Sequence, residues 1–133
     1  MESKRSAILL VESGDLSVEE MSNILGQGPD RFRRKGDPGT NPGRTLKVNI
    51  WEVRENVARE EYIGLALDRL WPRILPLQSG LVELSRRGSF IKLSMVQWIS
   101  AADPHGPGFG IGVDELRFLA EIGAPLDVDQ YVD

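Results

Sequence analysis

Polar and apolar positions along the chain follow two different periods, and the period-two segments predict strands. Four segments have a strand pattern: 7–11, 46–53, 89–99 and 125–131. The first is apolar on both pleat faces, which is typical of a central strand that is covered on both sides, or of a strand in a tight interface. In the second, alternation predicts that Leu46, Val48 and Ile50 share the inward face. The last alternates behind Pro125, as an edge strand does.

The helix-period segments are 17–25, 58–71, 77–87 and 113–122. Ser17 and Glu20 have the spacing of a capping box, and Gly26 marks the end of that helix. Pro72 is expected to break or kink the chain after the second helix, and Gly80 weakens the prediction of the third. In the last helix the inward positions are predicted to be Val113, Leu116, Leu119 and Ala120.

This order of elements predicts one α+β domain over residues 1–133. We expect a two-layer sandwich, with a sheet of about four strands, mostly antiparallel, and three to four helices on one face. Two long Gly/Pro-rich loops, 27–45 and 103–112, interrupt the pattern. Loops of this length in a compact domain are functional or partly mobile. The pattern does not fix the strand order.

Composition removes several kinds of chemistry. The chain has no cysteine, so disulfides, thiol catalysis, zinc fingers and iron–sulfur clusters are not expected. The N-terminal apolar run is too short for a signal peptide, and no run has membrane-spanning length. We therefore expect a cytosolic protein without a cofactor.

Charge is polarised along the sequence, although the net charge is only −4. Basic residues gather between Arg31 and Lys47, and acidic residues gather between Asp114 and Asp133. A net negative chain does not coat nucleic acid by charge alone. Whether the polarity also exists in space depends on the fold.

The strongest candidate for a binding surface is the basic cluster in the first long loop. Its members are Arg31, Phe32, Arg33, Arg34 and Lys35. Cations with an interleaved aromatic ring can dock an acidic protein, or can grip phosphate and stack on a base. The alternative is a solvated loop that pairs with the acidic C-terminal region of the same chain. Trp51 joins the candidate set, with packing in or near the core as its alternative.

Other candidate chemistry is weaker. His105 is the one histidine, and it lies in a turn rather than against a nucleophile. The glycines between 106 and 112 precede a helix and could cradle an anion, but Asp114 and Glu115 would repel phosphate there. Asp127 and Asp129 share a strand face and form an acidic surface. A charged edge that blocks aggregation explains them as well as a cation site does, and we assign no metal.

Several segments together resemble a bacterial family known as domain of unknown function 4279. The most specific are the turn Lys35-Gly36-Asp37 followed by Trp51, and the closing segment from Ile122 to Tyr131. Gly112 departs from the pattern, which has Ser or Thr as the helix cap. The resemblance implies a fold but no established activity, so no functional residue is carried over. It also implies a loose association with toxin-immunity and defence genes.

The leading functional hypothesis is a non-enzymatic protein-binding module, for which a toxin-immunity or accessory role would be one form. The first alternative is a small-ligand or anion binder, or an unrecognised enzyme, with a cleft near 103–112. The second alternative is nucleic-acid binding through residues 31–35. The partner's identity and the oligomeric state stay open.

Overall fold

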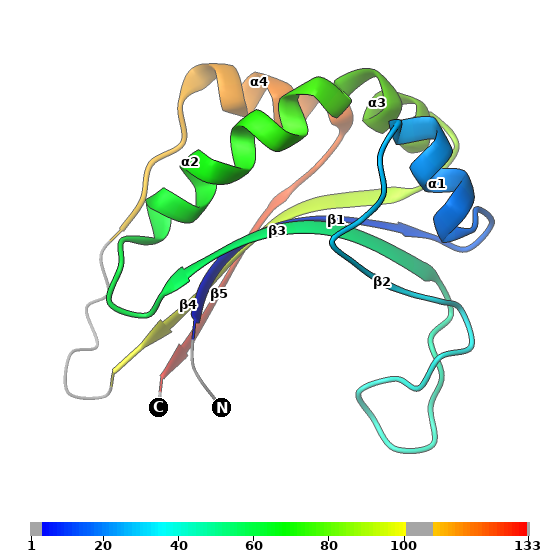
Figure 1. Ribbon diagram of the computed structural model, residues 1–133, viewed down its shortest axis with the longest axis horizontal. Coiled ribbons are helices and arrows are strands. Elements are labelled where there is room, and N and C mark those ends of the chain that lie inside the picture. The colour runs from blue at the N-terminus through cyan, green and yellow to red at the C-terminus, as the bar shows by residue number, and fades with distance from the viewer. Residues whose placement is uncertain (1–3, 101–107, 133) are drawn as a thin grey trace.

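One sheet with helices on a single face makes up the protein (Figure 1). The computed structural model describes residues 4–100 and 108–132. Within them the sheet has five strands in the order β2-β3-β1-β4-β5. The strands are β1 (Lys4–Ser13), β2 (Arg31–Arg33), β3 (Asn49–Ala58), β4 (Phe90–Ile99) and β5 (Leu126–Val132). The helices are α1 (Val18–Leu25), α2 (Ile63–Ile74), α3 (Gln78–Arg86) and α4 (Val113–Ile122), with a 3₁₀ turn at Leu75–Leu77.

The core lies between the three central strands and the helices. Leu9 of β1 is paired with Val53 of β3 on one side and with Leu93 of β4 on the other. All three side chains are completely buried. Because side chains alternate along a strand, this row faces the helices, and the neighbouring positions face away from them. Helix α2 supplies most of the cover, through residues such as Ile63, Leu67 and Leu70.

The α+β class is confirmed, but the sheet has five strands rather than about four, and it is mixed. The additional strand, β2, lies inside the predicted loop 27–45. It is short, and it pairs antiparallel with β3 from Arg31 to Arg33. The final edge strand is confirmed, and it pairs parallel with β4 because α4 carries the chain across the helical face between them.

The prediction that β1 is a central strand is confirmed, but the expected cover on both sides by other layers is wrong. Ile8 and Leu10 point to the face that carries no helix, and the described part of the chain has no second layer there (Figure 1). Ile8 is nonetheless buried and Leu10 is half-buried. Their cover comes from neighbouring side chains on the same face. We call this face, away from the helices, the open face.

The second strand prediction has the wrong phase. Trp51 and Val53 are completely buried under the helices, so Ile50 lies on the open face instead of inward. Leu46 and Val48 precede the strand, which begins at Asn49. In a period-two pattern an error of one residue inverts every side chain. The bulk of Trp51 sets the phase here.

Helix boundaries are confirmed where capping residues mark them. Ser17 accepts a hydrogen bond from the Glu20 backbone, and the Glu20 carboxylate accepts one from the Ser17 backbone. Gly26 ends α1 in the left-handed region, at φ 78°. The final helix spans 113–122 as predicted, but its inward face differs, because the buried residues are Phe118, Leu119 and Ile122.

Helix α2 departs from the prediction at both ends. It begins at Ile63 rather than near Ala58, and it continues through Pro72 to Ile74. Proline removes one helical hydrogen bond. Here its ring is exposed while Trp71 and Ile74 are buried on either side, so burial of the flanking residues holds the last turn. None of the helices in the described ranges is long and apolar enough to span a bilayer.

Gly80 is a packing requirement of α3, although it weakened the sequence prediction of that helix. A Cβ at this position would lie 2.8 Å from the Ile24 carbonyl oxygen and 3.1 Å from Leu25 Cα. Helices α1 and α3 therefore approach each other at a point where only hydrogen fits.

We expect Gly80→Ala to lower the free energy of unfolding by about 1–2 kcal/mol, because overpacking outweighs the gain of ~1 kcal/mol in helix propensity. The matched control is Gly14→Ala, where a Cβ would meet no atom within 4 Å. Denaturant unfolding of both variants is the measurement. Equal stability of the two variants would contradict a tight α1–α3 contact.

Candidate functional site

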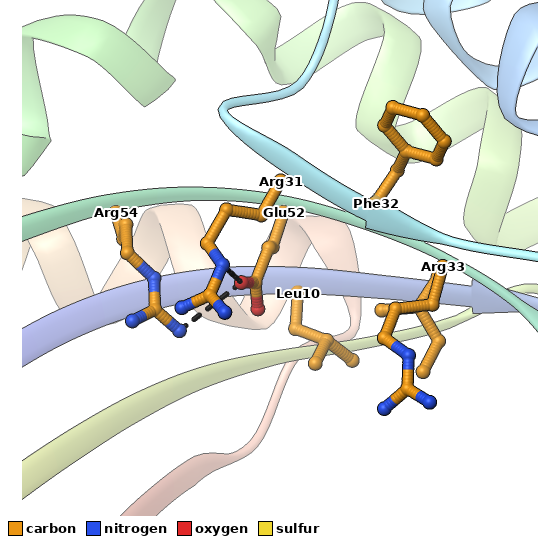
Figure 2. Close-up of a pocket in the computed structure, with 7 residues that line it drawn as sticks. Leu10, Arg31, Phe32, Arg33, Glu52 and Arg54 are labelled. Atoms are coloured by element: carbon orange, nitrogen blue, oxygen red, sulfur yellow. Dashed lines mark hydrogen bonds and ion pairs between the residues drawn. The ribbon is translucent and has the colours of Figure 1, made fainter. Parts of the chain in front are cut away.

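A shallow pocket on the open face brings together three arginines (Figure 2). Its volume is about 280 Å³. Arg31 and Arg33 come from β2, and Arg54 comes from β3, two positions after Glu52. The floor is apolar and is formed by Leu10 and Ile50. Arg31, Arg33 and Arg54 share this face because they occupy alternate positions on neighbouring strands. We call this the arginine pocket.

Glu52 organises the arginine pocket. Its Oε1 lies 3.0 Å from Arg54 Nη2 and 3.7 Å from Arg31 Nε. The Glu52 side chain is only 12% exposed, whereas that of Arg31 is 64% exposed. The lining of the pocket has three guanidinium groups and only this one carboxylate, so positive charge remains uncompensated there. Arg33 also donates to the Pro38 carbonyl oxygen, which fixes its position at the rim.

The predicted cluster 31–35 is divided between two faces. Figure 2 shows Phe32 pointing away from Arg31 and Arg33. Phe32 is half exposed, and the Arg34 guanidinium lies 4.9 Å from the centre of its ring. Lys35 Nζ donates to the Gly14 carbonyl oxygen. Phe32 is among the residues that line the arginine pocket, but of the four cations in the cluster only Arg31 and Arg33 line it.

Arg34 holds the start of the loop against α1. Its two terminal nitrogens lie 3.0 and 2.7 Å from the two carboxylate oxygens of Glu19. This hydrogen-bonded pair lowers the pKa of Glu19 from 4.5 to about 2. It also raises the pKa of Arg34. Asp37 accepts a hydrogen bond from the Arg34 backbone at 2.7 Å and closes the turn over Gly36.

Trp51 does not belong to the binding surface, because it is completely buried. Its indole Nε1 donates to Ser22 Oγ at 3.2 Å, which satisfies its polar atom inside the core. The alternative prediction for Trp51, that it packs in or near the core, is therefore confirmed. Trp98 is different: it stacks on Tyr131 with ring centres 4.9 Å apart, between β4 and β5.

A second ion-pair cluster positions β2. Asp30 precedes this strand, and its Oδ1 lies 2.7 Å from Arg73 Nη2 on α2. Its other oxygen accepts from the Arg54 backbone at 2.9 Å. Arg73 in turn donates to the Arg54 carbonyl oxygen at 3.0 Å. The Arg73 hydrogen bond holds the pKa of Asp30 below its ordinary value.

The acidic C-terminal region lies at the opposite edge of the sheet. Asp127 and Asp129 pair in register with Ser94 and Val96 of β4, so they also face the open side. Asp127 Oδ2 lies 3.5 Å from Lys92 Nζ. Since β2 and β5 are the two outermost strands, the basic cluster does not pair with this acidic region. The polarity of the sequence is therefore a polarity across the open face.

The glycine-rich loop is described only from residue 108, and His105 and Gly106 lie outside the described residues. At the start of α4, Gly112 provides no side-chain cap. Glu115 Oε2 would lie only 2.4 Å from a Cβ on Gly112. A carboxylate of the chain itself therefore lies close to this helix N-terminus, where it would repel an anion. Within the described ranges no group of three metal-ligating side chains occurs.

Sequence reasoning missed Leu10, Glu52 and Arg54 as parts of a site. The spacing of Glu52 and Arg54 was the available signal, because polar residues two apart in a strand share a face. This signal is usable only if Trp51 is assigned to the inward face. The sequence pattern instead predicts Leu46, Val48 and Ile50 on that face. The contribution of Leu10 depends on strand order, which the sequence pattern leaves open.

The fold and this site together define an α+β protein with an arginine-lined pocket on an uncovered sheet face. The chain belongs to the family described as Domain of unknown function (DUF4279), whose model matches residues 2–133. Neither the search of curated proteins nor the search of solved structures finds a match. The family description specifies no activity, so any function has to be inferred from the site.

We expect Arg34→Gln to raise the pKa of Glu19 from about 2 back toward 4.5, because the charged hydrogen-bond donor is lost. A lowered carboxyl pKa stabilises the fold above the unfolded pKa, and this stability is lost as the pH falls through the folded pKa. The variant should therefore lose less stability than the wild type between pH 4.5 and about 2. Carboxyl NMR titration measures the shift. Arg33→Gln is the control, and an unchanged Glu19 titration in Arg34→Gln would refute the pairing.

We expect Arg73→Ala to loosen β2, since the side chain joins α2 to Asp30 and to the Arg54 carbonyl oxygen. The cost should be about 1 kcal/mol, as for a partly exposed charged hydrogen bond. Hydrogen exchange of the β2 amides should become faster, while that of β1 stays unchanged. Arg69→Ala, at an exposed position on the same helix, is the control. Equal protection of β2 in both variants would show that Arg73 does not anchor it.

Proposed function

We propose that the chain is a non-enzymatic protein-binding module that recognises an acidic segment of a partner on its open face. The arginine pocket is the observation that carries the proposal. Three arginines and one glutamate line it together with Leu10 and Ile50. Glu52 is paired with Arg31 and Arg54, and Arg31 is largely exposed. Aspartate or glutamate side chains of a partner would meet arginine in the forked geometry that it favours. Apolar neighbours on the partner would cover Leu10 and Ile50.

The distribution of carboxylates favours a protein partner over nucleic acid. Glu12 and Glu52 lie on the open face, and Asp127 and Asp129 lie at its far edge. A polyanion that crossed the sheet from the arginine pocket would meet these acids. A protein segment can instead place acidic residues at one end and basic residues at the other. An immunity or accessory role would be one form of this function.

A small carboxylate or phosphate ligand is the second candidate. The pocket volume of about 280 Å³ is near the lower limit for small-molecule sites, roughly 300 Å³. Convergent arginines suit such an anion. The pocket is shallow and open to solvent, so a ligand of this kind would bury little surface, and we rank it second.

The test compares affinity capture from the source organism with three baits. Arg31→Glu/Arg33→Glu should lose the specific partner that the wild type retains, because reversing these charges repels an acidic segment. Arg69→Glu/Arg86→Glu carries the same change in net charge on the helical side, where both residues are exposed. This control should keep the partner. Capture should also weaken with salt, since exposed charges are screened.

Equal capture by Arg31→Glu/Arg33→Glu and the wild type would contradict the proposed face. Saturable chemical-shift changes at Arg31, Arg33 and Arg54 on titration with citrate or inorganic phosphate would favour the second candidate. Binding of single-stranded DNA in low salt that Arg31→Glu/Arg33→Glu abolishes would favour a nucleic-acid interface instead.

A further inference from the structure

The two edges of the sheet are complementary to each other. The β2 edge has the sequence Arg31-Phe32-Arg33, and the β5 edge contains Asp127-Val128-Asp129. In each strand the charged residues face the open side. Phe32 pairs with Trp51 and Val128 pairs with Met95, so both apolar residues face the helical side. Phe32 is 51% exposed and Val128 is 43% exposed. The β2 edge therefore has an apolar residue between two cations, and the β5 edge has an apolar residue between two anions.

We propose that these edges bind each other between two copies of the chain, so that copies associate head to tail through a continuous sheet. The occupant of the β5 edge is the β2 edge of a second copy. Both are terminal strands of the sheet. In Figure 1, β2 crosses in front of β3, and β5 lies farther from the viewer, at the other edge of the sheet.

The strand directions agree with this arrangement. β1 is antiparallel to both β3 and β4. β2 is antiparallel to β3, and β5 is parallel to β4. Hence β2 has the same direction as β1, and β5 has the opposite direction. A second copy that continues the sheet, with its helices on the same side, therefore brings β2 against β5 in the antiparallel sense.

The register that opposes Phe32 and Val128 forms both ion pairs. Residues directly opposite each other in an antiparallel pair have side chains on the same face. Arg31 of one copy then lies opposite Asp129 of the other, and Arg33 lies opposite Asp127. The Arg31 side chain is 64% exposed and that of Asp127 is 49% exposed, so one member of each of the two ion pairs is well exposed to solvent.

Twofold pairing of like edges is disfavoured by the same residues. An antiparallel β5–β5 pair centred on the strand places Asp129 opposite its own copy. A β2–β2 pair centred on Phe32 places Arg31 opposite Arg33. Like charges directly opposite each other destabilise a strand pair. The edges thus reject symmetric dimers and accept only the head-to-tail contact, which forms open chains or rings.

The interface is small, because β2 contributes only three residues. We therefore expect weak association that depends on concentration and salt. In low salt the sedimentation coefficient of the wild type should rise with concentration, and in about 1 M salt it should return to the monomer value. A wild type that sediments as a monomer at every concentration in low salt would overturn the proposal.

Charge reversal gives a matched pair of variants. Arg31→Asp/Arg33→Asp makes both edges acidic, and Asp127→Arg/Asp129→Arg makes both edges basic. Each alone should stay monomeric, whereas an equimolar mixture should associate, because each edge then finds an opposite one. Arg69→Asp/Arg86→Asp has the same charge change on the helices and should associate like the wild type. Failure of the mixture to associate, with each variant folded by circular dichroism, would refute the contact.

The absence of cysteine from the sequence allows a direct test of register. Phe32→Cys and Val128→Cys variants are mixed and oxidised. Residues opposite each other in this way have Cβ atoms about 4.5–5.5 Å apart, within reach of a disulfide after small adjustment. The mixed disulfide should exceed both homodisulfides, and a yield at or below the statistical ratio would overturn the register.

This inference does not depend on the proposed function. Asp127→Arg/Asp129→Arg leaves the arginine pocket unaltered, so it should lose self-association and still capture the acidic partner. Loss of capture together with loss of self-association in this variant would count against the proposed function alone. Retained capture with monomeric wild type would count against the edge contact alone.

Discussion

Within residues 4–100 and 108–132, helices cover only one face of the sheet, and this constraint determines what the remaining positions must do. On the covered face, Leu9, Val53 and Leu93 form a row that is completely shielded from water. On the other face, the alternate positions of the same strands have to be compatible with solvent. Arginine and glutamate meet this need, because their stems shield apolar neighbours such as Ile8 and Leu10 while their charged groups stay hydrated. The arginine pocket is a consequence of that arrangement.

Charges on the open face are therefore held by short-range contacts and not by a second layer. Glu52 lies within 4 Å of both Arg31 and Arg54. Asp30 and Arg73 fix the strand that carries Arg31, from outside the face. Ion pairs exposed to this degree contribute little to stability, about 0–1 kcal/mol each. Their value lies in position: they keep guanidinium groups close together without neutralising all of them.

The sequence predicted elements best where local chemistry marks them. Ser17, Glu20 and Gly26 specify α1 by capping, and Gly123 ends α4 in the left-handed region. The phase of β3 was wrong because Leu46, Val48 and Ile50 alternate as regularly as Trp51 and Val53 do. Tertiary burial decides between the two, and periodicity alone does not. β2 was missed because a three-residue strand owes its existence to β3 and to Asp30, which are distant in sequence.

The same reasoning explains why the site was found only in part. Arg31 and Arg33 were selected by charge, and strand alternation then separated them from Phe32 and Arg34. That separation turns a run of basic residues into an edge with one charged side and one apolar side. β5 has the opposite charge in the same alternation, at the other end of the sheet. Because the two edges carry opposite charge, pairing of two identical edges is disfavoured. A contact between copies of the sheet would therefore join unlike edges, head to tail.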